Sequence, residues 1–205
     1  MNMKKLLIFI FSIGFILSAN LKSADKSILN INDNDFFIGN PDAPIVILEY
    51  ASMSCSHCAD FHNETLEDLK AEYIDSGKVV FVFRDFPFNY PALVGSMMMR
   101  CVPDDLRYDY MNALYKLQKS WVFRDNSKTR TELYKIMQSG GMQQDDFDTC
   151  LSDINLENDL LEGVMNAQRE FNIRSTPSFV INGVLYSGNK DIKEFRQIID
   201  KILSE

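Results

Sequence analysis

The distribution of apolar residues predicts a strand, a helix and a second strand in the first half of the chain. The runs 44–50 and 78–83 are largely apolar and rich in β-branched residues, as in strands that are buried on both faces of a sheet. Between them, apolar residues recur at the spacing of one helix face, at Cys58, Phe61, Leu66, Leu69 and Tyr73. Two such strands joined by a helix form a right-handed β-α-β unit with parallel strands.

Residues from about 91 to 172 carry a different pattern. Five segments there have mostly helical spacing of apolar residues, with turn signals between them: 92–102, 107–118, 129–139, 145–152 and 156–171. We therefore expect this block to be a helical insertion.

The last part of the chain returns to strand signals. The apolar runs 178–181 and 184–186 flank Asn182-Gly183, a dipeptide that favours a two-residue hairpin turn, and residues 192–203 have the amphipathic pattern of a helix. Strand, helix and strand, followed by a hairpin and a helix, is the element order of the thioredoxin fold. The order follows from the pattern alone, and its resemblance to that fold implies an α/β, thioredoxin-like fold with a helical insertion.

The first twenty residues have the pattern of a secretory signal peptide. Two lysines precede an apolar run over 6–17, and small residues follow over 18–20. The run is shorter than the roughly 18 to 20 apolar residues that span a bilayer, which favours a cleaved signal over a retained anchor. We expect residues 1–19 to be removed, with the cut between 19 and 24, and residues 25–205 to form one exported domain.

Charge and cysteine content narrow the possible functions. The formal net charge of −8 argues against binding to nucleic acid or to anionic lipid headgroups. Four cysteines in an exported chain imply disulfides, and one catalytic pair with one structural pair would use all of them.

The motif Cys55-Ser56-His57-Cys58 lies at the junction of the first strand and its helix. Unpaired backbone N–H groups and the positive end of the helix dipole favour a thiolate at Cys55. A stabilised thiolate is both a nucleophile and a good leaving group. Protonated His57 would add a positive charge nearby, and Cys58, one turn into the helix, is within reach of Cys55 for a disulfide. The motif therefore predicts catalytic thiol–disulfide exchange.

Two other roles are compatible with this motif. A structural zinc site would use Cys55, Cys58 and His62, with Cys101 or Cys150 as the fourth ligand, whereas a structural disulfide would only join Cys55 to Cys58. The position directly after a buried strand favours catalysis. We assign His62 no role and expect it to be solvated or to cap the helix, and we expect no metal or other cofactor.

The chain resembles the DsbA-type family of exported thiol:disulfide oxidoreductases over essentially all of the expected mature part. The matching segments are Gly39–Pro44, Leu48–Tyr50, Cys55–Cys58, Arg84–Pro87 and Ser175–Gly183. A C-x-x-C motif combined with a downstream Thr-Pro, a strand and an Asn-Gly turn is far more specific than C-x-x-C alone.

The resemblance implies roles for three residues outside the motif. Pro177 is expected to be cis and to face the sulfurs, because a cis bond makes a tight turn and proline places no N–H beside the thiolate. The backbone of Thr176 is then free to pair with an extended substrate. Glu49 is expected to help move the proton of Cys58, since a buried carboxylate is costly without a partner or a task. An ion-paired or partly exposed Glu49 is the alternative.

The resemblance also implies a structural disulfide between Cys101 and Cys150 that holds the insertion, with tuning of the redox potential or free thiols as alternatives. Two residues depart from the best-studied oxidases of the family. Ser56 stands where those proteins carry proline, and Thr176 stands in place of an aliphatic residue, as in the isomerase branch.

The implied function is that of a periplasmic oxidase that introduces disulfide bonds into exported polypeptides through Cys55 and Cys58. A membrane quinone-linked partner of the DsbB kind would reoxidise it, and we expect it to act as a monomer. A disulfide isomerase or reductase on the same scaffold is one alternative. A metal-binding chaperone using Cys55, Cys58 and His62 is the alternative from a different class.

Overall fold

The computed structural model of the protein describes Ile31 and residues 35–205. The signal peptide expected over 1–19, and its cleavage between 19 and 24, lie outside the described residues. Within the described part, no helix combines the length and the apolar character needed to cross a membrane.

A five-stranded sheet forms the centre of the described structure, with the strand order β1-β3-β2-β4-β5. The strands are β1 (Phe36–Ile38), β2 (Ile45–Ala51), β3 (Val79–Asp85), β4 (Ser178–Ile181) and β5 (Val184–Ser187). β2 and β3 are parallel, with Ile47 opposite Phe81, as the β-α-β pattern predicts. The other neighbouring strands are antiparallel. β1 is not predicted from the sequence, because three residues are too few to show a strand period.

Residues along β2 face two different cores. Ile45 and Ile47 contribute to the larger apolar cluster, which is completed by α1 (Ser56–Glu64), α9 (Ile192–Leu203) and the insertion helices. Leu48 and Tyr50 face a smaller cluster that includes Ala167 of α8 (Ile154–Phe171). β2 and β3 are therefore covered on both faces, which explains why their sequences are apolar runs without alternation.

The connection between β2 and β3 is helical but not continuous. It comprises α1 (Ser56–Glu64), α2 (Leu66–Leu69) and the π-helical turn η2 (Lys70–Ile74). The sequence predicts one unbroken helix face, but Thr65, with φ of −116°, interrupts it. The apolar stripe persists through the break, since Phe61, Leu66 and Leu69 are fully buried.

Six helices separate β3 from β4. They are α3 (Tyr90–Cys101), α4 (Asp104–Lys116), α5 (Gln118–Trp121), α6 (Asn126–Ser139), α7 (Gln144–Leu151) and α8 (Ile154–Phe171). Five correspond to the expected helical segments, and the four-residue α5 is the additional one. Side chains of Asn89, Asp125 and Asp153 accept hydrogen bonds from the first turns of α3, α6 and α8, which explains where these helices begin.

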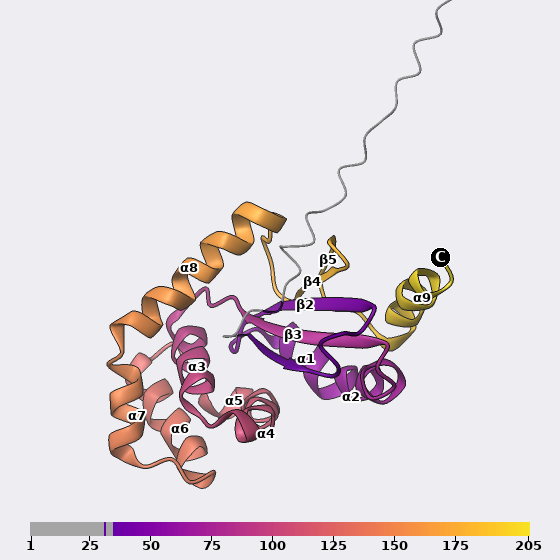
Figure 1. The fold of residues 1–205 in the computed structure, drawn as a ribbon. Helices are drawn as coiled ribbons and strands as arrows, with labels where there is room; N and C mark the ends of the chain where they lie inside the picture. The colour runs from indigo at the N-terminus through magenta and orange to yellow at the C-terminus, as the bar shows by residue number, and fades with distance from the viewer. Residues whose placement is uncertain (1–30, 32–34) are drawn as a thin grey trace, which may run out of the picture.

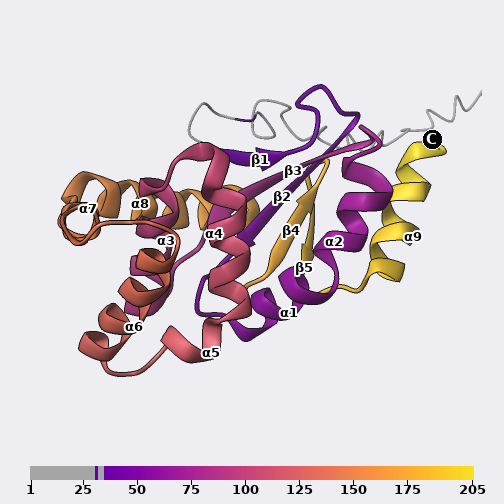
Figure 2. The ribbon, with the colours of Figure 1, turned by 90° about the horizontal axis from the view of Figure 1, so that it is seen from below.

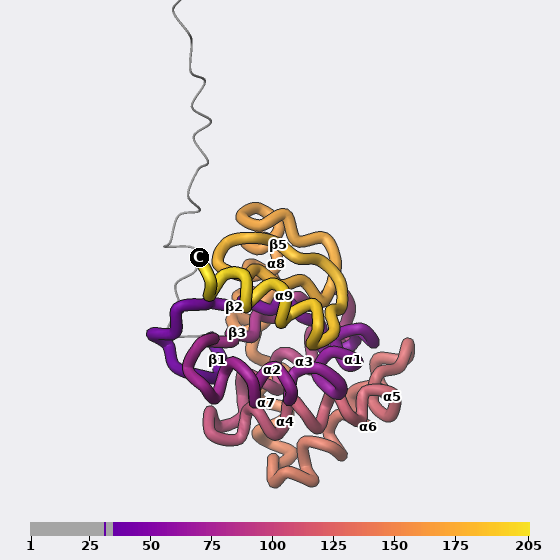
Figure 3. Tube along the Cα trace, turned by 90° about the vertical axis from the view of Figure 1, so that its right-hand side faces the viewer, coloured from indigo at the N-terminus to yellow at the C-terminus, as the bar shows by residue number. Residues whose placement is uncertain are grey.

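The helices are distributed unevenly around the sheet. α3, α6 and α7 gather at one end, whereas α2 and the last helix, α9 (Ile192–Leu203), lie side by side at the other end (Figures 1 and 2). Seen along the sheet, the β5 edge with α8 lies on one side of β2 and β3, and α4 to α7 lie on the other (Figure 3). α1 begins just after the carboxyl end of β2 and packs against α4 of the insertion.

Candidate active site

Cys55 is the N-cap residue of α1, four residues after the end of β2. Its side chain is half-buried, whereas Cys58, one turn further into α1, is fully buried. The two cysteines are free thiols in this structure. The motif therefore provides one sulfur that a substrate can reach and a second that is enclosed by the protein.

The surroundings of Cys55 favour its thiolate. A hydrogen bond from the Cys58 thiol is the main cause that lowers the pKa of Cys55, to about 5, and burial opposes it. Thr176 and the backbone N–H groups of Cys58 and His57 lower the pKa further. The N–H contribution is the one expected of a helix N-terminus.

Cys58 has the opposite character. Burial raises the pKa of its thiol, and the hydrogen bond with Cys55 and the charge of Glu49 raise it further. The backbone N–H of Ser52 donates to the Cys58 sulfur at 3.5 Å. Because ionisation is favoured at one sulfur and opposed at the other, the pair is suited to a nucleophilic and a resolving role.

The turn before β4 packs against the nucleophilic sulfur. The Thr176–Pro177 peptide bond is cis, and the Cys55 thiol donates to the carbonyl oxygen of Thr176 at 3.3 Å. Pro177 is buried, whereas Thr176 remains partly accessible. The structure thus brings together Cys55, Cys58, Thr176 and Pro177, which come from two segments about 120 residues apart in sequence.

Glu49 lies on β2 with its side chain fully buried, and its partner is His62. The His62 Nε2 atom is 3.0 Å from Oε2 and 3.2 Å from Oε1 of Glu49. The expectation that His62 is solvated or caps the helix is therefore wrong. It is buried because it lies four residues after Cys58, on the face of α1 that packs against the sheet.

Two residues of the insertion contact this site and are not predicted from the sequence. The Gln118 side-chain amide donates to the carbonyl oxygens of Cys55 at 2.9 Å and of Met53 at 3.0 Å. The ring of Tyr115 stacks on the His62 ring, with 4.0 Å between centroids. Both contacts depend on how α4 and α5 pack on α1, for which the sequence carries no local signal.

His57 is placed differently from the cysteines. Its side chain is 71% exposed, and its Nδ1 atom lies 3.5 Å from Asp60. In the structure, His57 acts on Cys55 through its backbone N–H. A contribution of the imidazolium charge remains a prediction.

A disulfide joins Cys101 at the end of α3 to Cys150 in α7. The structural zinc site considered above is not assembled. Cys101 and Cys150 are bonded to each other, His62 contacts Glu49, and the described residues contain no cluster of three or more side chains able to hold a metal.

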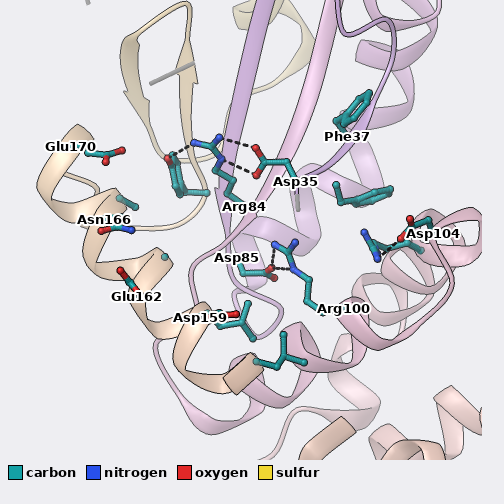
Figure 4. Close-up of a pocket in the computed structure, with 17 residues that line it drawn as sticks. Asp35, Phe37, Arg84, Asp85, Arg100, Asp104, Asp159, Glu162, Asn166 and Glu170 are labelled. Atoms are coloured by element: carbon teal, nitrogen blue, oxygen red, sulfur yellow. Dashed lines mark hydrogen bonds and ion pairs between the residues drawn. The ribbon is translucent and has the colours of Figure 1, made fainter. Parts of the chain in front are cut away.

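A separate cavity of about 1010 Å³ lies between α8 and the ends of β2 and β3 (Figure 4). Its walls are rich in ion pairs, including Arg84 with Asp35 and Arg100 with Asp85. Neither redox cysteine lines it. The half-buried Cys55 lies instead beside the cis-proline turn.

Comparison with known proteins identifies the family of this chain. The thioredoxin family profile matches residues 31–201. A putative protein-disulfide oxidoreductase of Rickettsia bellii is 33% identical over 181 residues, which cover 88% of this chain and 69% of that protein. A second one, from Rickettsia conorii, is 30% identical over 89% of this chain and 65% of its own length. The chain thus spans about two thirds of these relatives.

Solved structures agree with the sequence matches. The crystal structure of α-DsbA1 from Wolbachia pipientis has a TM-score of 0.81 and 30% identity, covering 87% of this chain and 95% of that one. BdbD from Bacillus subtilis shares the fold, with a TM-score of 0.72 at 19% identity, over 84% of this chain and 94% of that one. With the two thiols, the cis-proline turn and the thioredoxin-like sheet in place, the chain belongs to the thioredoxin family and, within it, to the DsbA-type protein-disulfide oxidoreductases.

Proposed function

We propose that this protein is a dithiol oxidase that introduces disulfide bonds into exported polypeptides in the periplasm. The observation that carries the proposal is the placement of the half-buried Cys55 at the N-terminus of α1 beside the fully buried Cys58, which lowers the pKa of Cys55 to about 5. A sulfur that is stable as a thiolate is a good leaving group, so electrons move readily from substrate thiols to the enzyme.

The reaction begins with a substrate thiolate that attacks the Cys55 sulfur of the oxidised enzyme. The Cys55–Cys58 bond breaks, a mixed disulfide forms at Cys55, and Cys58 leaves as a thiolate that takes up a proton. A second substrate thiolate then attacks the substrate sulfur of the mixed disulfide. The substrate disulfide forms, Cys55 leaves as a thiolate, and two electrons have passed to the enzyme. When the second substrate thiol is absent, Cys58 attacks Cys55 and releases the substrate.

The cis-proline turn offers a place for the substrate backbone. Pro177 has no N–H, and Thr176 is partly exposed directly beside Cys55. An extended substrate pairs with the Thr176 backbone as an added strand, which presents its sulfur to Cys55. Glu49, buried beneath the cysteines, exchanges the proton of Cys58.

The cycle requires an oxidant that regenerates the Cys55–Cys58 disulfide. A membrane quinone-linked protein of the DsbB kind has this role in our proposal. The signal-like pattern of residues 1–19 supports export, and we propose that the mature protein works as a monomer.

The redox potential of the purified protein, measured against glutathione, tests the proposal. A value near that of DsbA, about −120 mV, supports an oxidase, whereas one near that of thioredoxin, about −270 mV, contradicts it. In parallel, Cys55→Ser should abolish exchange, and Cys58→Ser should accumulate mixed disulfides with substrate. An absence of adducts on Cys58→Ser would also contradict it.

The residue before the cis-proline favours a second candidate, a disulfide isomerase on the same scaffold. Thr176 stands where oxidases of the family carry an aliphatic residue. An isomerase would reactivate a substrate with scrambled disulfides faster than it oxidises a reduced one. Comparing the two rates on the same substrate separates these functions.

A further inference from the structure

A buried acid–base pair lies beneath the redox cysteines. The side chains of Glu49 and His62 are 0% and 1% exposed, and Nε2 of His62 contacts both carboxylate oxygens. The other ring nitrogen, Nδ1, is buried and has no hydrogen-bond partner among the described residues. Burial of such groups is costly, and a stability role alone is served as well by apolar side chains.

The pair shares its compartment with Cys58. Cys58 and His62 are four residues apart on α1 and therefore lie one above the other on the face that meets β2. Glu49 projects from β2 toward this face, and its charge is felt at the Cys58 sulfur. A thiol, a carboxylate and an imidazole thus lie together in a space closed to bulk water.

The other neighbours of His62 do not hold exchangeable protons at neutral pH. Tyr115 from α4 stacks on its ring, and burial raises the pKa of the Tyr115 phenol. Phe83 from β3 and Phe61 from α1 complete the ring contacts. The titratable groups that contact His62 are Glu49 from β2 and Tyr115 from α4. The charges of Cys58, Glu49, Asp85 of β3 and Cys55 act in turn on Tyr115.

The proposed exchange reaction requires that a proton reach and leave the Cys58 sulfur. When Cys58 leaves as a thiolate, its charge is in apolar surroundings until a proton arrives, and the proton must leave again when Cys58 attacks a mixed disulfide. In contact with both Glu49 carboxylate oxygens lies an imidazole, a side chain that can both donate and accept a proton. The Glu49–His62 pair is therefore suited to supply this proton and to take it back.

We propose that His62 sets the protonation of Glu49 and thereby governs proton exchange with Cys58. As Cys58 leaves, a proton passes from the His62 imidazolium through the Glu49 carboxylate to the Cys58 sulfur, which leaves His62 neutral and Glu49 as it began. The reverse transfer accompanies the attack of Cys58 on a mixed disulfide. His62 is a positioning residue, since it acts through Glu49. This inference rests on the proposed function.

The test isolates the step in which Cys58 acts. A glutathione adduct is formed on Cys55 of the full mature protein, and glutathione release is followed from about pH 5 to 8, the range in which imidazole titrates. The wild type should show an inflection in this range. His62→Gln keeps a hydrogen-bond donor for Glu49 but does not titrate, so the inflection should disappear. Release at pH 7 should fall by about tenfold, less than the roughly hundredfold or more that a direct general acid or base contributes, because His62 acts through Glu49.

Matched variants separate proton exchange from packing. Tyr115→Phe keeps the ring on His62 and should retain the wild-type profile. Glu49→Gln should lose the inflection as His62→Gln does, and it replaces that variant if His62→Gln does not fold. The Cys55 titration should stay close to the wild-type value in His62→Gln, because Glu49 and His62 are not among the main causes of its shift.

The outcomes are distinct. A wild-type profile in His62→Gln, or an equal fall in rate at every pH, would overturn the inference and leave the oxidase proposal standing. Wild-type protein that forms an adduct at Cys55 but never releases glutathione would also overturn the inference. Wild-type protein that forms no adduct at Cys55 would overturn the oxidase proposal itself, and this inference with it.

Discussion

Reduction of the Cys55–Cys58 disulfide is expected to stabilise the folded protein by an amount that grows with pH. The Cys55 thiol ionises with a pKa of about 5 in the fold, whereas an ordinary thiol in the unfolded chain has a value of about 8.5. A group whose pKa is depressed by folding contributes its full stabilisation above the unfolded value and loses it as the pH falls through the folded value. The window therefore runs from about pH 8.5 down to about pH 5.

The magnitude follows from the same shift. At pH 7, about two units above the folded pKa, full linkage would stabilise the reduced form by about 3 kcal/mol. Cys55 is only half-buried, so solvent screens the interaction, and we expect about 1 to 2 kcal/mol. Near pH 5 the contribution should be well below 1 kcal/mol on the same relation, roughly a few tenths.

Denaturant unfolding of the oxidised and reduced forms at several pH values measures this difference. The measurement uses a background with Cys101→Ser and Cys150→Ser, so that only the active-site disulfide changes. Groups common to both forms cancel in the difference. Cys55→Ser is the control and should show no such pH dependence relative to the oxidised protein. The comparison is restricted to about pH 5 to 8, because above this range the buried Cys58 thiol, whose pKa is raised by the fold, opposes the effect. A difference that is independent of pH in this range, or that shrinks as the pH rises, would refute the reasoning.

Two further predictions concern the insertion. Gln118→Leu removes two hydrogen bonds to the carbonyls of Cys55 and Met53 and should destabilise the protein by about 2 kcal/mol, measured by denaturant unfolding. It should also raise the Cys55 pKa, and an unchanged stability and titration would show that the amide does not hold the loop. Replacing both Cys101 and Cys150 by serine opens a loop with a sequence separation of 49 and should cost about 4 kcal/mol. A loss within experimental error of zero would contradict the loop-entropy account.

The parts of the fold that the sequence predicts are those with a strong local pattern. β2 and β3 are recognisable because burial on both faces makes each an apolar run, and the Asn182-Gly183 turn identifies the β4–β5 hairpin. β1 and α5 have only three and four residues, too few for a period to show. The break at Thr65 leaves the apolar stripe intact, so the pattern cannot reveal it.

The site was predictable to the extent that it is local. Cys55 and Cys58 follow from the motif at a strand–helix junction, whereas the position of Thr176 and the cis-proline comes from family resemblance, because the contact spans 121 residues. The burial of His62 had a usable signal, its four-residue spacing from Cys58 on an apolar face. The contact of Gln118 had none, since it arises only when α5 packs on the active-site loop.

The ionisation of Cys55 tests the central claim most directly. In the reduced protein, the ultraviolet absorbance of the thiolate is followed against pH, with Cys55→Ser as the blank that removes this sulfur alone. The account predicts a titration midpoint near 5. A midpoint near the ordinary thiol value of about 8.5 would contradict it.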